Sequence, residues 1–220
     1  IQTLPLKYRT LVRSGLDVDD FSCIESIFRE INPDIVINCI GLLKQFATVN
    51  DPLISLPINS LLPHRLARLS DTYDARFIHV STDCVFSGTT GMYVEDSLPD
   101  SVDLYGISKR LGEVDYPNAI TLRTSMIGHE LNSQHSLVDW FLSQSYKVKG
   151  FDKAIFSGLP TVEIARIIRD YVIPNPTMTG IYHISADPIN KYDLLILVKK
   201  IYQKNINIIK NSDLVIDRSL

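Results

Sequence analysis

The residues best suited to chemistry in this chain are Tyr105 and Lys109, in the segment Asp103-Leu-Tyr-Gly-Ile-Ser-Lys109. A spacing of four residues places both side chains on one face of a helix, one turn apart. An ammonium group close to a phenol favours the phenolate, so we expect the pKa of Tyr105 to lie below its usual value of about 10. The pair would then act as an acid and base near neutral pH. Spacing alone decides little, because about half a match of this kind is expected by chance.

The segment upstream makes a catalytic interpretation stronger. Residues 76–81 have the composition of a buried strand, and that strand delivers the hydroxyls of Ser81 and Thr82 at its end. A strand end with hydroxyls, followed by a helix with Tyr and Lys, is the layout of a hydride-transfer site. Thr82 could also be a cap of the strand end, and Ser81 is equally compatible with a structural role.

The motif Ser81-Thr-Asp-Cys-Val-Phe-Ser-Gly88, followed by Tyr105 and Lys109, resembles the extended short-chain dehydrogenase/reductases. The resemblance is specifically to the dTDP-4-dehydrorhamnose reductase branch, which reduces 4-keto nucleotide sugars for deoxysugar and surface polysaccharide biosynthesis. It runs from about Gly15 to the C-terminus and is strongest over residues 33–130. It implies NADPH or NADH as cofactor and a nucleotide sugar as substrate. It is also compatible with a homodimer.

The expected fold is α/β, with a Rossmann-like doubly wound parallel sheet and a small C-terminal substrate lobe. Apolar runs alternate between strand-like and helical spacing, which indicates parallel strands joined by helical crossovers. We expect a partial Rossmann cofactor domain at residues 1–128 and a sugar-nucleotide lobe at residues 129–220, with elements of the two interleaved. The expected strands are 34–41, 76–81, 119–125 and 180–185, and the expected helices are 20–31, 59–73, 105–114, 137–143, 162–172 and 192–202. The run 34–41 is apolar enough for burial on both faces.

A dinucleotide site of this fold needs a glycine-rich turn between its first strand and first helix. None of the ten glycines forms Gly-x-Gly-x-x-Gly or a near variant. The family places that turn before Asp17 and Val18. We therefore expect that the N-terminal strands and the glycine-rich turn are missing and that the chain is a fragment, which would bind the cofactor poorly by itself.

The resemblance also implies a role for each matching residue. Tyr105 would protonate the sugar O4, Lys109 would hold the nicotinamide ribose, and Thr82 would bind the substrate carbonyl. Asn59 would support Lys109 through a water, although an Asn at a helix start is as often an N-cap. The remaining cofactor candidates are Asp17, Val18, Asn38, Ile40, Gly41, Thr124 and Ser125, and the remaining substrate candidates are His135, Trp140, Lys149 and Lys153.

Composition narrows the other classes of function. A net charge of −3 without a basic run argues against nucleic-acid binding, and no apolar stretch reaches the length of about 20 residues that a membrane span needs. The three cysteines have no metal-ligand spacing and indicate reduced thiols in the cytoplasm. Two alternatives stay open: a non-catalytic binding or regulatory subunit of the same fold, and a nucleotide-sugar epimerase.

Overall fold

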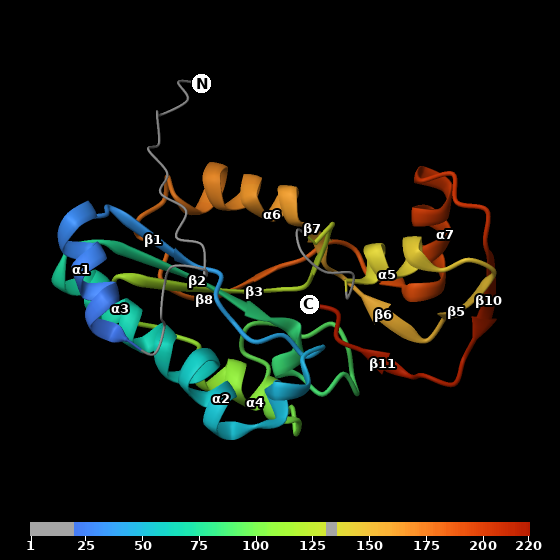
Figure 1. Ribbon diagram of the computed structural model, residues 1–220, viewed down its shortest axis with the longest axis horizontal. Helices are drawn as coiled ribbons and strands as arrows, with labels where there is room; N and C mark the ends of the chain where they lie inside the picture. The colour runs from blue at the N-terminus through green and yellow to red at the C-terminus, as the bar shows by residue number, and fades with distance from the viewer. Residues whose placement is uncertain (1–19, 131–135) are drawn as a thin grey trace.

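The computed structural model describes residues 20–130 and 136–220, and its centre is a parallel four-stranded sheet (Figure 1). The strand order is β1-β2-β3-β8. The strands are β1 (Ile35–Asn38), β2 (Arg76–Thr82), β3 (Ala119–Thr124) and β8 (Gly180–Ile184). Thr82 pairs with Thr124 across β2 and β3, so these two strands end side by side. The expected α/β class is confirmed.

Helices cover both faces of this sheet, as Figure 1 shows. On one face lie α1 (Phe21–Ile31), α3 (Leu62–Thr72) and α4 (Leu104–Leu111), and on the other lies α6 (Thr161–Ile167), continued by the π-helical turn η5 (Ile168–Val172). Successive side chains of β2 point to opposite faces of the sheet and so pack in both helical layers. Phe77 packs with α1 and α3, whereas Ile78 packs with α6. Two separate apolar cores therefore hold the sheet in place.

The second helical region is longer than its sequence pattern predicts. It begins at α2 (Pro52–Leu56), passes through a π-helical turn η3 (Pro57–Leu61) and continues into α3. Asn59 lies inside the π-helical turn, so the N-cap interpretation of this residue is wrong. Pro63 lacks the N–H that would bond to Asn59 four residues earlier, and the backbone of Gly112 packs against the same Asn59 carbonyl.

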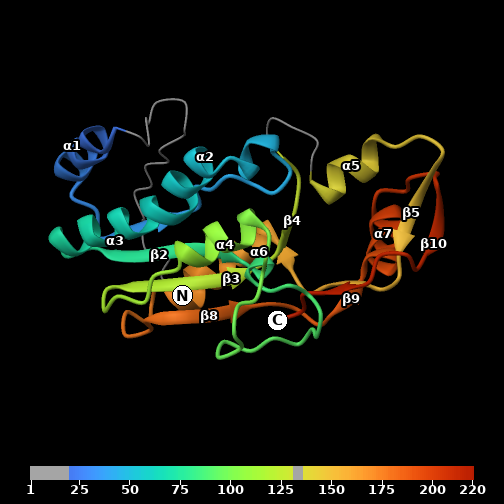
Figure 2. The ribbon, with the colours of Figure 1, turned by 90° about the horizontal axis from the view of Figure 1, so that it is seen from below.

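A small lobe lies beyond the carboxyl ends of the strands, far from α1 and α3 in both ribbon views (Figure 2). Its core joins α5 (Leu137–Ser143), α7 (Lys191–Ile201) and the parallel pair of β5 (Lys147–Phe151) and β10 (Asn207–Asn211). Short strands connect it to the sheet: β4 (Met126–Ile127), β6 (Ala154–Phe156), β7 (Leu159–Pro160), β9 (Ile189–Asn190) and β11 (Ile216–Asp217). Two 3-10 turns, η2 (Ala47–Asn50) and η4 (Asp83–Val85), complete the described elements.

Nine of the ten expected strands and helices have counterparts within a few residues; the expected helix 59–73 corresponds to the longer region described above. The prediction that the run 34–41 forms a strand buried on both faces is wrong for β1. It is an edge strand of the described sheet, and its Ile37 is 44% exposed. Within the described residues no helix is long and apolar enough to cross a membrane.

The contact between Gly112 and Asn59 gives a test of how α4 is seated. A Cβ at position 112 would lie 2.0 Å from the Asn59 carbonyl oxygen, which belongs to the backbone and cannot move away cheaply. We expect Gly112→Ala to lower the free energy of unfolding by about 1–3 kcal/mol, as overpacking does. Urea denaturation of this variant beside Glu25→Ala, at an exposed position of α1, measures the effect. Equal stability of the two variants would contradict the packing described.

Candidate active site

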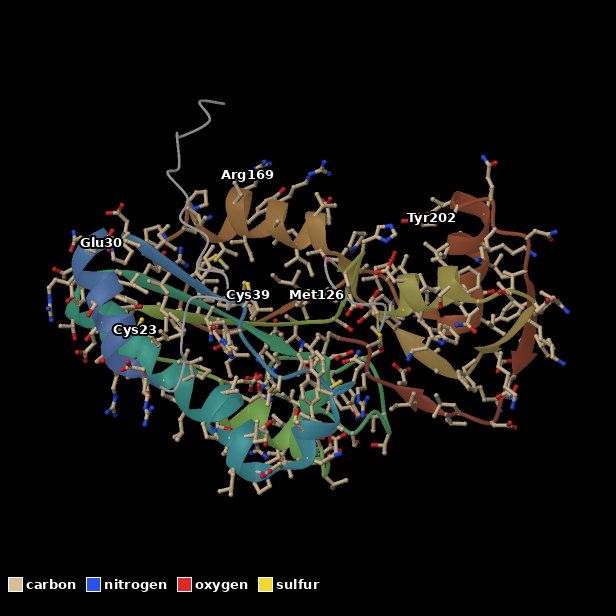
Figure 3. All side chains as sticks on the ribbon, in the orientation of Figure 1. Cys23, Glu30, Cys39, Met126, Arg169 and Tyr202 are labelled. Atoms are coloured by element: carbon tan, nitrogen blue, oxygen red, sulfur yellow. The ribbon has the colours of Figure 1, made fainter. Side chains whose placement is uncertain are left out.

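Lys109 is the buried cation at the centre of the site. Its side chain projects from α4 to the ends of the strands, where Nζ donates a hydrogen bond of 3.0 Å to the Val80 carbonyl oxygen. Burial lowers the pKa of Lys109 to about 8, while Glu113 and Cys39 act in the opposite direction. In Figure 3 the labelled Cys39 and Met126, which follow β1 and β3, mark this edge of the sheet.

Tyr105 and Thr82 meet at the same edge, as the sequence predicts. Burial raises the pKa of Tyr105, and the nearby Cys84 adds to the rise, whereas a hydrogen bond with the Thr82 side chain opposes it. Thr82 Oγ1 also accepts from the Cys84 N–H at 3.1 Å, so Thr82 caps the strand end as well. The expectation that Lys109 lowers the pKa of Tyr105 is wrong for this arrangement, because loss of solvent outweighs every stabilisation of the phenolate.

Asn59 connects the loop after β1 to α4. Its Oδ1 accepts the Leu42 N–H at 2.8 Å, and its Nδ2 donates to the Ser108 hydroxyl at 3.1 Å. Gly41 lies against both functional side chains, since a Cβ there would be 3.3 Å from Asn59 Oδ1 and 3.8 Å from Lys109 Nζ. Asn59 therefore holds Ser108, the residue before Lys109, in position. The support of Lys109 by Asn59 through a water stays a prediction.

The end of β1 is shaped by a second buried amide. Asn38 Nδ2 lies 3.1 Å from His79 Nδ1, and Asn38 Oδ1 accepts the Ile40 N–H at 3.0 Å. Burial lowers the pKa of His79 well below its usual value, so the ring is neutral and Nδ1 can accept from the amide. The loop from residue 38 to residue 41 is thus fixed from both sides at the strand end where the cofactor is expected.

A buried ion pair holds the far end of α4 to the sheet. Arg123 Nε and Nη2 each donate to the Glu113 carboxylate at 2.8 Å, and the two side chains are 3% and 5% exposed. The Ser81 hydroxyl donates to the same carboxylate at 2.8 Å. Ser81 and Arg123 thus bond to one carboxylate just before the hydroxyls of Thr82 and Thr124, which sets where those hydroxyls lie.

The two candidates after β3 lie beside a buried acid. Thr124 Oγ1 donates to the Ser125 carbonyl at 3.3 Å, and Ser125 is a hydrogen-bond partner of Asp83. Burial raises the pKa of Asp83 despite that bond. Thr82, Asp83 and Ser125 thus form one polar cluster at the ends of β2 and β3.

The substrate candidates are more dispersed. Trp140 lies on α5, Lys149 lies on β5 near Asp213, and Lys153 lies in the turn between β5 and β6. All three belong to the small lobe, and none has a hydrogen bond or ion pair to Thr82 or Tyr105 within the described residues. Asp17, Val18 and His135 lie outside the described residues.

The sequence matches the RmlD substrate-binding domain over residues 2–213. The chain belongs to the RmlD substrate-binding domain family. Solved structures share its fold: a hypothetical dTDP-4-dehydrorhamnose reductase from Sulfolobus tokodaii superposes with a TM-score of 0.81 at 22% identity, covering 97% of this chain and 81% of that one.

A dTDP-4-dehydrorhamnose reductase from Bacillus anthracis, solved in complex with NADP, gives a TM-score of 0.78 at 21% identity, over 90% of this chain and 72% of that one. Among curated relatives, the chain is 26% identical over 200 residues to methionine adenosyltransferase 2 subunit beta from Xenopus laevis. The aligned region covers 81% of this chain and 58% of that protein. It is 25% identical over 196 residues to the dTDP-4-dehydrorhamnose reductase of Aggregatibacter actinomycetemcomitans, 84% of this chain and 67% of that protein. The chain therefore spans only part of the length of the curated relatives it matches.

Two groups at this candidate site are not predicted from the sequence. Glu113 follows Tyr105 and Lys109 at the same spacing of four, a signal that could have directed attention to it, although α4 ends at Leu111. Arg218 is held beside Cys84 from the far end of the chain. No local pattern predicts that contact, because 134 positions separate the two residues.

The burial of Lys109 has a measurable pH dependence. Its pKa is about 8 in the folded state and 10.5 ordinarily, so the unfolded chain binds more protons between those values. The wild type should therefore gain stability relative to Lys109→Met as the pH rises through this window, by about 1–3 kcal/mol. Denaturation of both proteins at pH 7, 8.5 and 10 measures the difference, in which other titrating groups cancel. A difference that stays constant with pH would contradict burial of the ammonium.

Proposed function

We propose that this protein is an NAD(P)H-dependent reductase of a 4-keto nucleotide sugar, acting in deoxysugar biosynthesis. The observation that carries the proposal is the convergence of Thr82, Tyr105 and Lys109 at the carboxyl ends of β2 and β3. Several relatives of the same family are named dTDP-4-dehydrorhamnose reductases, which supports this reaction and this class of substrate.

The protonation states of the site suit reduction. Burial raises the pKa of Tyr105, so its phenol keeps its proton at neutral pH and can give it to a carbonyl oxygen as that oxygen gains negative charge. The Thr82 hydroxyl, which is hydrogen-bonded to the phenol, would donate to the same oxygen and hold it in line. The nicotinamide cofactor supplies the hydride in this chemistry.

The residues around Lys109 fit the ribose of such a cofactor. An ammonium has three N–H donors, and one of them is taken by the Val80 carbonyl within the described residues. The other two can bond to vicinal hydroxyls. Asn38, Ile40 and Gly41 lie on the loop beside Lys109, where they would pack against the cofactor, and Thr124 and Ser125 border the neighbouring strand end.

The small lobe would bind the nucleotide sugar. It stands beyond the strand ends that carry Thr82 and Thr124, and hydride transfer needs the sugar C4 within about 3–3.5 Å of the reacting atoms at that edge. Residues 129–160 and 178–193 supply the elements on this side, including Trp140, Lys149 and Lys153. The division into a cofactor part at 1–128 and a substrate lobe at 129–220, with β8 and α6 returning to the sheet, belongs to this proposal.

Removal of the Tyr105 hydroxyl tests the reaction directly. In the full-length protein, Tyr105→Phe should lower turnover of a 4-keto nucleotide sugar by about 100- to 10,000-fold, because a positioned acid contributes that much. The affinity for NADPH should stay nearly unchanged, since only the proton donor is lost. NADPH oxidation and calorimetric titration measure the two quantities. Tyr171→Phe, at an exposed position, is the matched control.

Unchanged turnover in Tyr105→Phe would end the catalytic assignment. A wild type that binds nucleotide sugar and cofactor but shows no turnover would instead indicate a binding subunit of the same fold.

Removal of the Lys109 ammonium should affect two steps together. Lys109→Ala should weaken NADPH binding and lower the rate, because one group would hold the ribose and polarise the site. Lys200→Ala, at an exposed position of α7, should change neither. Titration and steady-state kinetics of both variants provide the comparison. If Lys109→Ala changed only the unfolding free energy, Lys109 would be a structural residue.

A further inference from the structure

The segment that begins with β11 crosses the loop that follows Thr82. We call residues 216–220 the C-terminal strap and residues 84–93 the site loop. The backbone of the strap is bonded to the site loop at two points, from Asp217 N to Gly88 O and from Tyr93 N to Ser219 O, both 2.8 Å. Ser219 Oγ accepts a further N–H from Met92 at 2.8 Å. These hydrogen bonds hold the strap in place against the site loop, which follows Thr82.

Two glycines in the site loop make this contact sterically feasible. Gly88 and Gly91 have φ angles of +86° and +70°, which other residues rarely adopt. A Cβ at position 88 would lie 2.5 Å from Ile216, and one at position 91 would lie 2.3 Å from the Asp217 carboxylate. Side chains of the strap therefore occupy the space that a Cβ would fill at both glycines.

This contact places the guanidinium of Arg218 next to Cys84. Arg218 Nε donates to the Phe86 carbonyl at 2.8 Å, and Nη1 lies 3.8 Å from Cys84 Sγ. Cys84 packs against the apolar cluster that contains Tyr105, and its N–H bonds to Thr82. Burial raises the pKa of Cys84 to about 11, so the thiol is neutral and does not balance the positive charge.

Arg218 also has no ion-pair partner within the described residues. Three carboxylates lie within its electrostatic reach, namely Asp83, Asp100 and Asp103. Each of them already accepts hydrogen bonds from other groups: Asp83 from Thr82, Asp100 from Ser87, and Asp103 from Lys44 and Gly106. A guanidinium has five N–H donors, so most of those on Arg218 are left for a ligand.

We propose that Arg218 is a specificity-determining residue that donates hydrogen bonds to hydroxyl oxygens of the substrate sugar, on the side of the ring next to the carbonyl. The inference rests on the proposed function for the place of that carbonyl, between Thr82 and Tyr105. Arg218 reaches the site through Cys84, which follows Thr82 by two residues, so the part of the substrate nearest to it is the sugar. The nucleotide diphosphate is the alternative acceptor, and the experiment separates the two.

The test compares two substitutions that share one defect. Arg218→Met and Arg218→Lys both lose the Nε donor to the Phe86 carbonyl, but only Lys keeps a cation that can reach the ligand. With NADP present, the full-length Arg218→Met variant should bind dTDP-rhamnose about tenfold more weakly than wild type, because it loses charge-assisted hydrogen bonds. Arg218→Lys should fall in between, and the affinity for dTDP without a sugar should change by less than about twofold in both. Calorimetric titration gives the affinities, and thermal melting shows that each variant folds.

Arg110→Met is the matched control, since Arg110 also donates to a backbone carbonyl, that of Pro99, but from an exposed position. It should leave the affinities for dTDP-rhamnose and for dTDP unchanged. Equal loss of dTDP and dTDP-rhamnose binding in Arg218→Met would assign Arg218 to the diphosphate and overturn the proposal. Equal affinities of Arg218→Met and Arg218→Lys for dTDP-rhamnose would show a structural role and overturn it as well.

The titrations need no turnover, so they also separate this inference from the proposed reaction. A wild type that binds dTDP-rhamnose without reducing any 4-keto sugar would contradict the reductase function while the Arg218 result still stands. A wild type that binds no nucleotide sugar would contradict both.

Discussion

The site depends on the buried ion pair between Glu113 and Arg123, because it fixes α4 to the strand ends. A bidentate pair with almost no solvent contact needs its remaining acceptors satisfied, and the Ser81 hydroxyl does this for Glu113. Loss of one partner would leave an uncompensated buried charge at a cost of about 3–5 kcal/mol. Tyr105 and Lys109 precede Glu113 by eight and four residues. Their positions over β2 and β3 therefore depend on that pair.

The same burial acts on the two functional side chains in opposite directions of pKa. Loss of solvent disfavours charge, so it raises the pKa of Tyr105 and lowers that of Lys109 to about 8. Mutual stabilisation of a phenolate and an ammonium would have produced the reverse. Glu113 and Cys39 limit the fall for Lys109, which keeps a substantial fraction of the amine charged at neutral pH. The arrangement thus presents a protonated phenol and a largely cationic amine one turn apart on α4, the pair of states that the proposed carbonyl reduction requires.

Local sequence pattern predicted the central elements well because their apolar periodicity reflects burial. Helix α5 occupies Leu137–Ser143, as its spacing indicates, and Tyr105 does meet Thr82. The prediction failed where local pattern and tertiary packing differ. The helical region begins at Pro52 rather than near Asn59, and its first turns expose Leu53, so they lack an amphipathic signal. The pairing of β5 with β10 joins segments 60 residues apart and leaves no local trace.

Asn59 illustrates why residue identity alone does not reveal a role. At a helix start an Asn would be an ordinary cap, but inside a π-helical turn its side chain is fully buried and must find partners in other elements. It finds them in Leu42 and Ser108, which lie on the loop after β1 and on α4. The strap shows the same effect over a longer range, since Gly88 and Gly91 indicate a turn in the sequence, while the reason for both glycines is the passage of residues 216–218 over them. The helix and strand ends that carry the chemistry are thus local features, whereas the contacts that aim them come from distant parts of the chain.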